Sequence, residues 1–235
     1  MIGGLGVGAV LLGGAAAHGA FHRNSPLFGR PITRAPADPI HPGERVVALT
    51  FDDGPNPDAT PPILDALATR GVKATFFILG RHAERWPEVV KRVADEGHAI
   101  GNHGYFHRKL HFKSPRYVRD DLTRGTLAIV QAGGGSPQLF RAPHGFRSPW
   151  VTWIARSLGQ QTVGWSLGVW DSDRPGVDAI AERTVSGTRP GSILLLHDGD
   201  GYDPSGDRMQ TAHAVPLIVE RLLAQGYRFG LLETG

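Results

Sequence analysis

The chain has 235 residues, of which 40% are hydrophobic and 20% are charged, so it is long enough to bury a substantial core and is not an intrinsically disordered tail. It contains no cysteine, which excludes disulfides, iron–sulfur clusters, Cys-bound zinc and a cysteine nucleophile. The charges are scattered and sum to +3, with no basic stripe, so no nucleic acid is expected as a partner.

The N-terminal run of residues 2–17 consists only of Gly and aliphatic residues, and the first side-chain cation, Arg23, comes after it. The run is shorter than the roughly 20 residues of a bilayer-spanning helix, and no basic region precedes it. We interpret residues 1–20 as a signal anchor or signal peptide that associates with a membrane, with a Gly-rich segment that packs or frays as the alternative. Because the arginines after the run favour a cytoplasmic C-terminal side, the topology stays open.

Residues 21–44 contain five prolines, which predicts an extended linker, and a globular domain is expected over residues 45–235. In that domain short apolar runs, typical of buried strands, alternate with longer helical patterns. The predicted strands are 46–51, 74–78, 98–100, 139–141, 162–166, 193–197 and 227–230. The predicted helices are about 61–70, 82–96, 115–132, 149–158, 178–186 and 211–225. This alternation predicts an α/β fold, a closed or nearly closed parallel barrel whose functional groups gather at the carboxyl ends of its strands.

The first and third predicted strands end in residues that could bind a metal. Asp52 and Asp53 close the first strand in the sequence TFDDGP, although a turn that merely stops the strand would explain these residues equally well in isolation. The third strand leads to His103 and His107, whose spacing lets both imidazoles point the same way. Two His and one carboxylate form a three-ligand site that keeps one coordination position for water, as in hydrolytic metal sites.

Polar residues also follow the fourth, fifth and sixth predicted strands. They are Arg141 and His144, then Asp171, then His197. A His at the end of an aliphatic strand is usually a satisfied core residue, but His197 would face the same mouth of the barrel as the carboxylates and the His pair. The convergence of these groups, more than any one of them, indicates a site.

Five motifs occur in order along residues 45–235: TFDDGP, His-x-x-x-His, Arg-x-Pro-x-Gly, a Trp-Ser stretch that carries an Asp, and Leu-x-His. In this order they resemble the polysaccharide deacetylases of the NodB-homology type, carbohydrate esterase family 4. The resemblance implies a distorted parallel (β/α) barrel of about seven strands as the catalytic domain. It also implies metal-dependent removal of N- or O-acetyl groups from sugars.

The resemblance implies a role for each matching residue. Asp53, His103 and His107 correspond to the metal ligands, most often of zinc, with cobalt or manganese as alternatives. Asp52 corresponds to the general base and His197 to the general acid. Adjacent carboxylates can divide these tasks, because a cation keeps its ligand ionised while the other carboxylate stays free to accept a proton.

The remaining roles concern positioning and the walls of the site. The resemblance implies that Arg141 orients the base and that Asp171 holds that arginine. The backbone N–H at His144 would stabilise the oxyanion, and Leu195 would form the wall against the acetyl methyl group. Trp170 would serve as a substitute wall where the family motif has another aromatic residue.

Three positions depart from the family pattern. Gly104 replaces a Ser or Thr whose hydroxyl braces the loop, so the metal ligands are expected to be less rigid. His144 replaces a Tyr or Phe, and Ser172 replaces an aromatic residue, so the substrate preference is expected to differ. Two further histidines, His82 and His111, are expected at the surface.

The tryptophans outside these motifs are expected to have structural roles. Trp86 precedes Pro87, and Trp150 and Trp153 lie in a predicted helix. All three are predicted to pack in the core or to brace helix ends and not to bind sugar.

The leading hypothesis is a metal-dependent deacetylase of a glycan with N-acetylglucosamine-like units in the cell envelope, either membrane-anchored or secreted, with the cytoplasm still open. One alternative is a hydrolase of a small non-sugar amide or imide. Another is a non-catalytic glycan-binding scaffold, which only the departures at Gly104 and Ser172 favour. No feature of the sequence defines an oligomeric state.

Overall fold

The structure is a computed structural model that describes residue 14, residues 17–36 and residues 43–232. The predicted membrane segment, residues 2–17, lies almost wholly outside this part of the chain. Among the described residues, no helix has both the length and the apolar character needed to cross a bilayer. The domain boundaries after residues 20 and 44 remain predictions.

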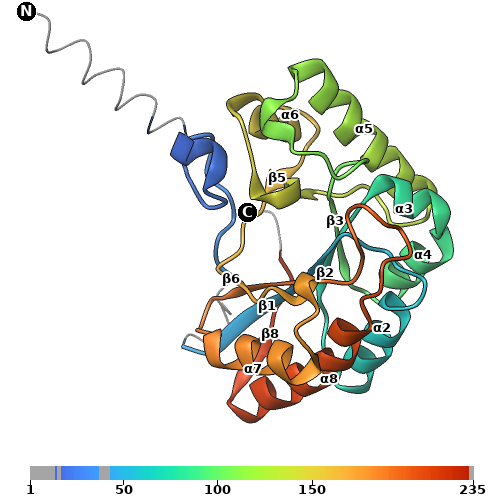
Figure 1. Cartoon of the computed structure of the whole chain (residues 1–235), viewed down its shortest axis with the longest axis vertical. Coiled ribbons are helices and arrows are strands. Elements are labelled where there is room, and N and C mark those ends of the chain that lie inside the picture. The colour runs from blue at the N-terminus through green and yellow to red at the C-terminus, as the bar shows by residue number, and fades with distance from the viewer. Residues whose placement is uncertain (1–13, 15–16, 37–42, 233–235) are drawn as a thin grey trace, which may run out of the picture.

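Eight parallel strands form one curled sheet in the order β5-β4-β3-β2-β1-β7-β6, with β8 paired to the first residues of β1 (Figure 1). Their bounds are β1 Arg45–Asp52, β2 Thr75–Ile78, β3 Ala99–Asn102, β4 Leu139–Phe140, β5 Gln161–Thr162, β6 Leu167–Gly168, β7 Ile193–His197 and β8 Tyr227–Phe229. This arrangement confirms the predicted α/β fold of a distorted parallel barrel.

Helices cover the outer side of the curled sheet (Figure 1). The α-helices are α2 Thr60–Thr69, α3 Gly80–Arg85, α4 Pro87–Asp95, α5 Pro115–Gln131, α6 Pro149–Ser157, α7 Val177–Gly187 and α8 Met209–Ala224. The short 3₁₀ helices are η1 Leu110–Phe112, η2 Pro143–Gly145 and η3 Asp171–Asp173. Several α-helices begin with a proline in the first turn, where its missing N–H has no intrahelical partner to lose.

The side chains of β1 alternate between the two faces of the sheet. Leu49 and Phe51 belong to the large apolar cluster between sheet and helices, whereas Ala48 belongs to the smaller cluster inside the curl. Because side chains alternate with a period of two, Thr50 and Asp52 share the inner face with Ala48. The helix-facing residues supply the main core, and the inner face is left for polar groups near the end of the strand.

The barrel is open between β5 and β6, which are the two ends of the strand order. On the free edge of the β5 region, Ile32 forms a parallel bridge with Val163, and its N–H donates to the Thr162 carbonyl at 2.9 Å. The expectation of a closed or nearly closed barrel therefore needs correction: residues ahead of β1 cover one edge of an open sheet.

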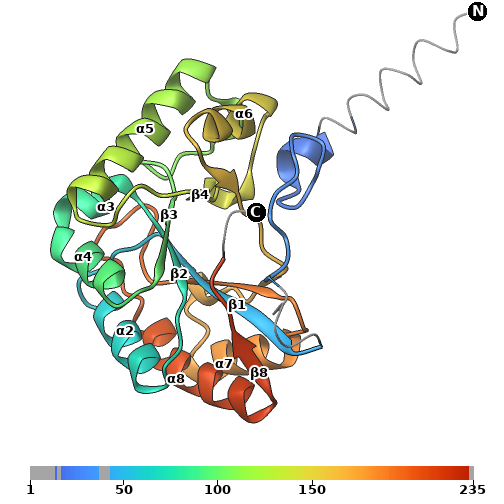
Figure 2. The ribbon, with the colours of Figure 1, turned by 180° about the vertical axis from the view of Figure 1, so that it is seen from behind.

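This covering segment, residues 17–36, packs against the barrel. The buried Arg147 binds it by donating from its backbone N–H to the Ala20 carbonyl at 3.1 Å and from Nη2 to the Ser25 carbonyl at 2.8 Å. Figure 2 shows the segment, in blue, running beside α6 toward β1.

Two predicted elements differ from the structure. The helix predicted over 82–96 is divided into α3 and α4 at Pro87, because proline has no N–H for an intrahelical hydrogen bond and its ring crowds the preceding turn. The strand predicted over 162–166 corresponds to β5, and the separate two-residue β6 was not predicted. A strand of two residues carries no detectable period.

Candidate active site

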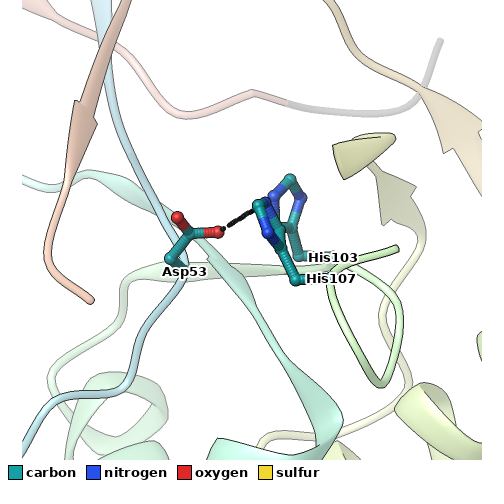
Figure 3. Close-up of side chains that lie close together, drawn as sticks. All are labelled: Asp53, His103 and His107. Atoms are coloured by element: carbon teal, nitrogen blue, oxygen red, sulfur yellow. Dashed lines mark ion pairs between the residues drawn. The ribbon is translucent and has the colours of Figure 1, made fainter. Parts of the chain in front are cut away.

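The candidate metal ligands meet where β1 and β3 end. Figure 3 shows Asp53, after β1, next to His103 and His107 from the loop after β3. The Oδ1 atom of Asp53 lies 3.3 Å from Nε2 of His103 and 3.2 Å from Nε2 of His107. One ligand atom from each residue lies within 4.8 Å of the other two, and all three residues are buried. This geometry matches the three-ligand site predicted from the sequence.

The chemistry of this group fits a divalent metal. Nδ1 of His103 is 2.8 Å from the Arg141 carbonyl, to which it donates, and this fixes the tautomer whose Nε2 has a free lone pair. The Oδ1 atom of Asp53 is buried and accepts no hydrogen bond from the described residues, so a metal would supply its missing partner. Burial would raise the pKa of Asp53, but His107 and His103 outweigh that effect and hold it below its ordinary value.

Burial lowers the pKa of His107 to about 3, although the charge of Asp53 opposes this, and the low pKa favours the neutral imidazole. A neutral imidazole is the form that binds a metal. The loop after β7 approaches its ring so closely that a Cβ atom at Gly201 would lie 2.1 Å from Nδ1. A glycine is therefore required at residue 201 for His107 to take this position.

The second carboxylate, Asp52, is held by Arg141, which follows β4. Nη1 of Arg141 donates to Oδ1 of Asp52 at 2.7 Å and to the Thr50 hydroxyl at 2.8 Å, and Nη2 donates to the Gly164 carbonyl at 3.0 Å. Arg141 is fully buried, and these bonds fix its position. The structure thus places Arg141 as the sequence resemblance implied, next to Asp52.

Asp171 holds His197 and not Arg141, so the pairing of Asp171 with the arginine was wrong. Its Oδ1 accepts from Nδ1 of His197 at 2.9 Å, and its Oδ2 accepts from the His197 backbone N–H at 2.8 Å. The reason is the strand order: Asp171 follows β6, beside β7, whereas Arg141 follows β4 on the other side of β1. Arg141 and Asp171 thus lie on opposite sides of β1.

This contact sets the charge of His197. Burial lowers its pKa, but the charge and hydrogen bond of Asp171, together with the charges of Asp53 and Asp52, outweigh burial and raise the pKa to about 9. His197 is therefore protonated at neutral pH. Because Nδ1 is bound to Asp171, Nε2 is the nitrogen left to donate a proton.

The site opens into a cleft of ≈ 640 Å³ that the metal ligands, Asp52 and His197 line together with other residues. Three of these are the predicted oxyanion residue, His144, and the predicted wall residues, Leu195 and Trp170. Leu195 is nearly buried, whereas Trp170 is 72% exposed at the rim. Tyr202, which the sequence analysis missed, also lines the cleft, and its hydroxyl is 3.2 Å from Nε2 of His144.

A second cavity of ≈ 710 Å³ lies elsewhere, between residues 26–30 and the region from α6 to β5. None of the predicted site residues line it. We therefore place the candidate chemistry in the cleft that contains both carboxylates.

The loop that carries His103 and His107 is braced by Asp121 of α5. Its carboxylate accepts from the backbone N–H groups of Tyr105 at 3.0 Å and Phe106 at 3.3 Å. Gly104 has a φ of +78°, and a Cβ atom there would lie 2.6 Å from this carboxylate. At this position Gly104 makes room for Asp121, which replaces the bracing hydroxyl expected from the family pattern.

His82 and His111 are not surface residues; His82 is fully buried and His111 is 5% exposed. Burial lowers the pKa of His82 to about 4, and its Nδ1 donates to the Asp53 carbonyl at 2.8 Å. His82 therefore holds the backbone of a metal ligand whose φ is +72°. His111 packs among phenylalanine rings, including Phe112 and Phe146.

Trp153 was predicted to pack in the core or at a helix end, but it is 63% exposed. The Arg119 guanidinium lies 5.6 Å from its ring centroid. Trp150 is partly buried and donates from Nε1 to the Lys113 carbonyl at 2.9 Å. Neither tryptophan lines the cleft, so neither is placed to bind a sugar there.

Comparisons with known proteins agree with this geometry. The family model "Polysaccharide deacetylase" matches residues 40–163. A chitooligosaccharide deacetylase of Bradyrhizobium is 38% identical over 79% of this chain and 88% of its own length. A peptidoglycan-N-acetylglucosamine deacetylase of Bacillus cereus is 39% identical over 79% of this chain and 85% of its own length.

Among solved structures, a family 4 carbohydrate esterase pseudoenzyme from Bacillus anthracis is similar, with a TM-score of 0.76 and 29% identity over 86% of this chain and 67% of that chain. The family match, the identities above and the shared fold together define the class. The chain belongs to the polysaccharide deacetylase family.

Proposed function

We propose that this protein is a zinc-dependent deacetylase that hydrolyses the N-acetyl groups of N-acetylglucosamine units in a cell-envelope glycan. One observation supports the proposal most: three groups line the same cleft. They are the Asp53–His103–His107 triad, the Asp52 carboxylate and the His197 imidazole. Zinc suits two imidazoles and one carboxylate, which also keep a coordination position open.

Asp53, His103 and His107 would hold the metal, which supplies a Lewis acid that polarises the acetyl carbonyl and makes water more acidic. Asp52 accepts the proton of the attacking water at a carboxylate oxygen. Arg141 orients Asp52, because its Nη1 donates to Oδ1. Asp52 therefore acts as the general base.

His197 acts as the general acid. Its Nδ1–H is committed to Asp171, so the proton that reaches the departing amine nitrogen comes from Nε2. The pKa of about 9 keeps that proton available at neutral pH. The backbone N–H at His144 stabilises the oxyanion, and Leu195 and Trp170 form walls for the acetyl group and the sugar.

The substrate class follows from the relatives. One is named for chitooligosaccharide and the other for peptidoglycan N-acetylglucosamine, and both substrates carry N-acetylated glucosamine units. Such glycans are found in or outside the cell envelope, so we place the action of this protein there. Membrane association through residues 2–17 stays a prediction.

The test is acetate release from N-acetylglucosamine oligomers by metal-stripped protein, before and after the addition of zinc, cobalt or manganese. Release that each metal restores, with zinc giving the highest rate at equal occupancy, would support the proposal. Highest activity with another metal would overturn the choice of zinc but keep the deacetylase.

The second candidate function is a glycan-binding scaffold without turnover, because one similar structure is a pseudoenzyme of the same family. The presence of Asp52, Arg141, His197 and the triad argues against it. Metal binding at the triad together with no acetate release from any acetylated glycan would favour the scaffold.

A further inference from the structure

One wall of the cleft comes from the N-terminal segment. Phe21, His22 and Arg23 line the cleft together with the metal ligands, although the family match begins only at residue 40. Asn24 ties this segment to the barrel by donating from Nδ2 to the Trp165 carbonyl at 2.9 Å. The N-terminal segment therefore supplies part of the cleft wall.

Arg23 is held in place on this wall. Its Nε donates to the Trp165 carbonyl at 3.0 Å, and its guanidinium carbon lies 5.1 Å from the centroid of the Trp165 ring. The guanidinium carbon of Arg141 lies 5.7 Å from the same centroid. Arg23 and the arginine that binds Asp52 therefore both lie against the same indole.

Among the described residues, Arg23 differs from the other arginines near the cleft in having no ion-pair partner. Arg208, which also lines the cleft, forms an ion pair with Asp200 at 2.7 Å, and Arg141 forms one with Asp52 at 2.7 Å. Within the described part of the chain, no carboxylate forms an ion pair with Arg23. Its guanidinium contacts the carbonyl and the ring of Trp165, and its backbone carbonyl accepts a hydrogen bond from Arg147.

A fixed guanidinium with free N–H donors is suited to bind a carboxylate, which can accept two parallel hydrogen bonds from it. Neutral oligomers of N-acetylglucosamine carry no such group. We propose that Arg23 makes the cleft selective for an N-acetylated glycan that carries a carboxylate on the sugar next to the one deacetylated. This inference rests on the proposed function and defines the substrate class within it.

The test uses two substrates that differ only in the carboxylate. One is a disaccharide of N-acetylglucosamine and a second sugar with a free 3-O-lactyl carboxylate, and the other is its methyl ester. We expect the wild-type protein to deacetylate the free acid with a kcat/KM roughly three- to tenfold higher. The preference should fall as NaCl is raised, because salt screens a partly exposed pair.

The Arg23→Gln variant should bring the ratio of the two kcat/KM values close to one, mainly through a higher KM for the acid. Arg23→Lys, which keeps the charge, should retain part of the preference. Arg30→Gln is the matched control, because Arg30 belongs to the same segment but lines the other cavity. Its ratio should equal that of the wild type.

The outcomes separate the inference from the proposed function. If Arg23→Gln lowers turnover of acid and ester equally, Arg23 only supports Trp165, and the selectivity is overturned while the deacetylase stands. The same holds if the wild type treats both substrates alike. No acetate from either disaccharide or from the neutral oligomer, with metal bound, would overturn both.

Discussion

Two neighbouring aspartates do different work because their partners differ. Asp53 faces two imidazoles, whereas Asp52 receives hydrogen bonding from Arg141. The backbone at Asp53 is left-handed, with a φ of +72°, and this turns its side chain away from the alternation that β1 would impose. A single residue step thus separates the proposed metal ligand from the proposed base.

Replacement of Asp52 by Asn should leave metal binding intact and lower turnover at least about 100-fold, because the base is lost while the ligands are kept. Metal content is measured by mass spectrometry of the purified protein, and turnover by acetate release. His107→Ala is the matched variant: it should lose metal as well as activity. Substantial turnover by metal-loaded Asp52→Asn would show that another group is the base.

The pH dependence of turnover tests His197. Its raised pKa means that the acid is protonated, and active, below about pH 9 and that activity falls as pH rises through that value. Asp171→Asn removes a charge that raises the pKa of His197. In a plot of kcat against pH, the fall in activity on the basic side should therefore move to lower pH, whereas the fall on the acidic side should stay where it is. A basic limb that stays in place would assign it to another group.

At the scale of strands and loops, β3 and its following loop depend on Asp121, which the sequence did not indicate. Asp121→Ala leaves the N–H groups of Tyr105 and Phe106 without acceptors, which should cost about 1–3 kcal/mol of unfolding free energy. Chemical denaturation measures this loss. Asp121→Asn keeps one carbonyl acceptor, so it should lose less unfolding free energy than Asp121→Ala. Equal stability of the two variants would contradict the bracing role.

Much of the fold and the site could be predicted because both depend on local patterns. Apolar runs mark the buried strands, and Asp53, His103 and His107 follow directly after strands whose ends must meet at one edge of a parallel sheet. The sequence pattern did not predict which side chains contact one another in the site. Which side chain Asp171 holds, and why His82 is buried, depend on strand order and on helix packing between residues far apart in the sequence.

At the scale of the whole molecule, the N-terminal segment pairs with the β5 edge of the sheet, where no further strand follows in the strand order. Ile32 covers the free edge of the β5 region, and Arg147 has its acceptors at Ala20 and Ser25. The segment therefore packs against the barrel, although the family match starts after it.

Deletion of residues 1–36 should lower the midpoint of thermal unfolding, because it exposes a sheet edge and leaves buried Arg147 donors unpaired. Deletion of residues 1–13 is the control and should leave the midpoint unchanged. Differential scanning calorimetry measures both. Equal midpoints for the two deletions would mean that the segment adds no stability.

The proposed proton acceptor and proton donor are anchored on opposite sides of β1, Asp52 through Arg141 after β4 and His197 through Asp171 after β6. Substitutions around Asp171 can thus adjust one limb of the pH profile without moving the other. Descendants of this chain that enter an acidic or an alkaline habitat have a route to adapt that leaves the metal and water activation untouched.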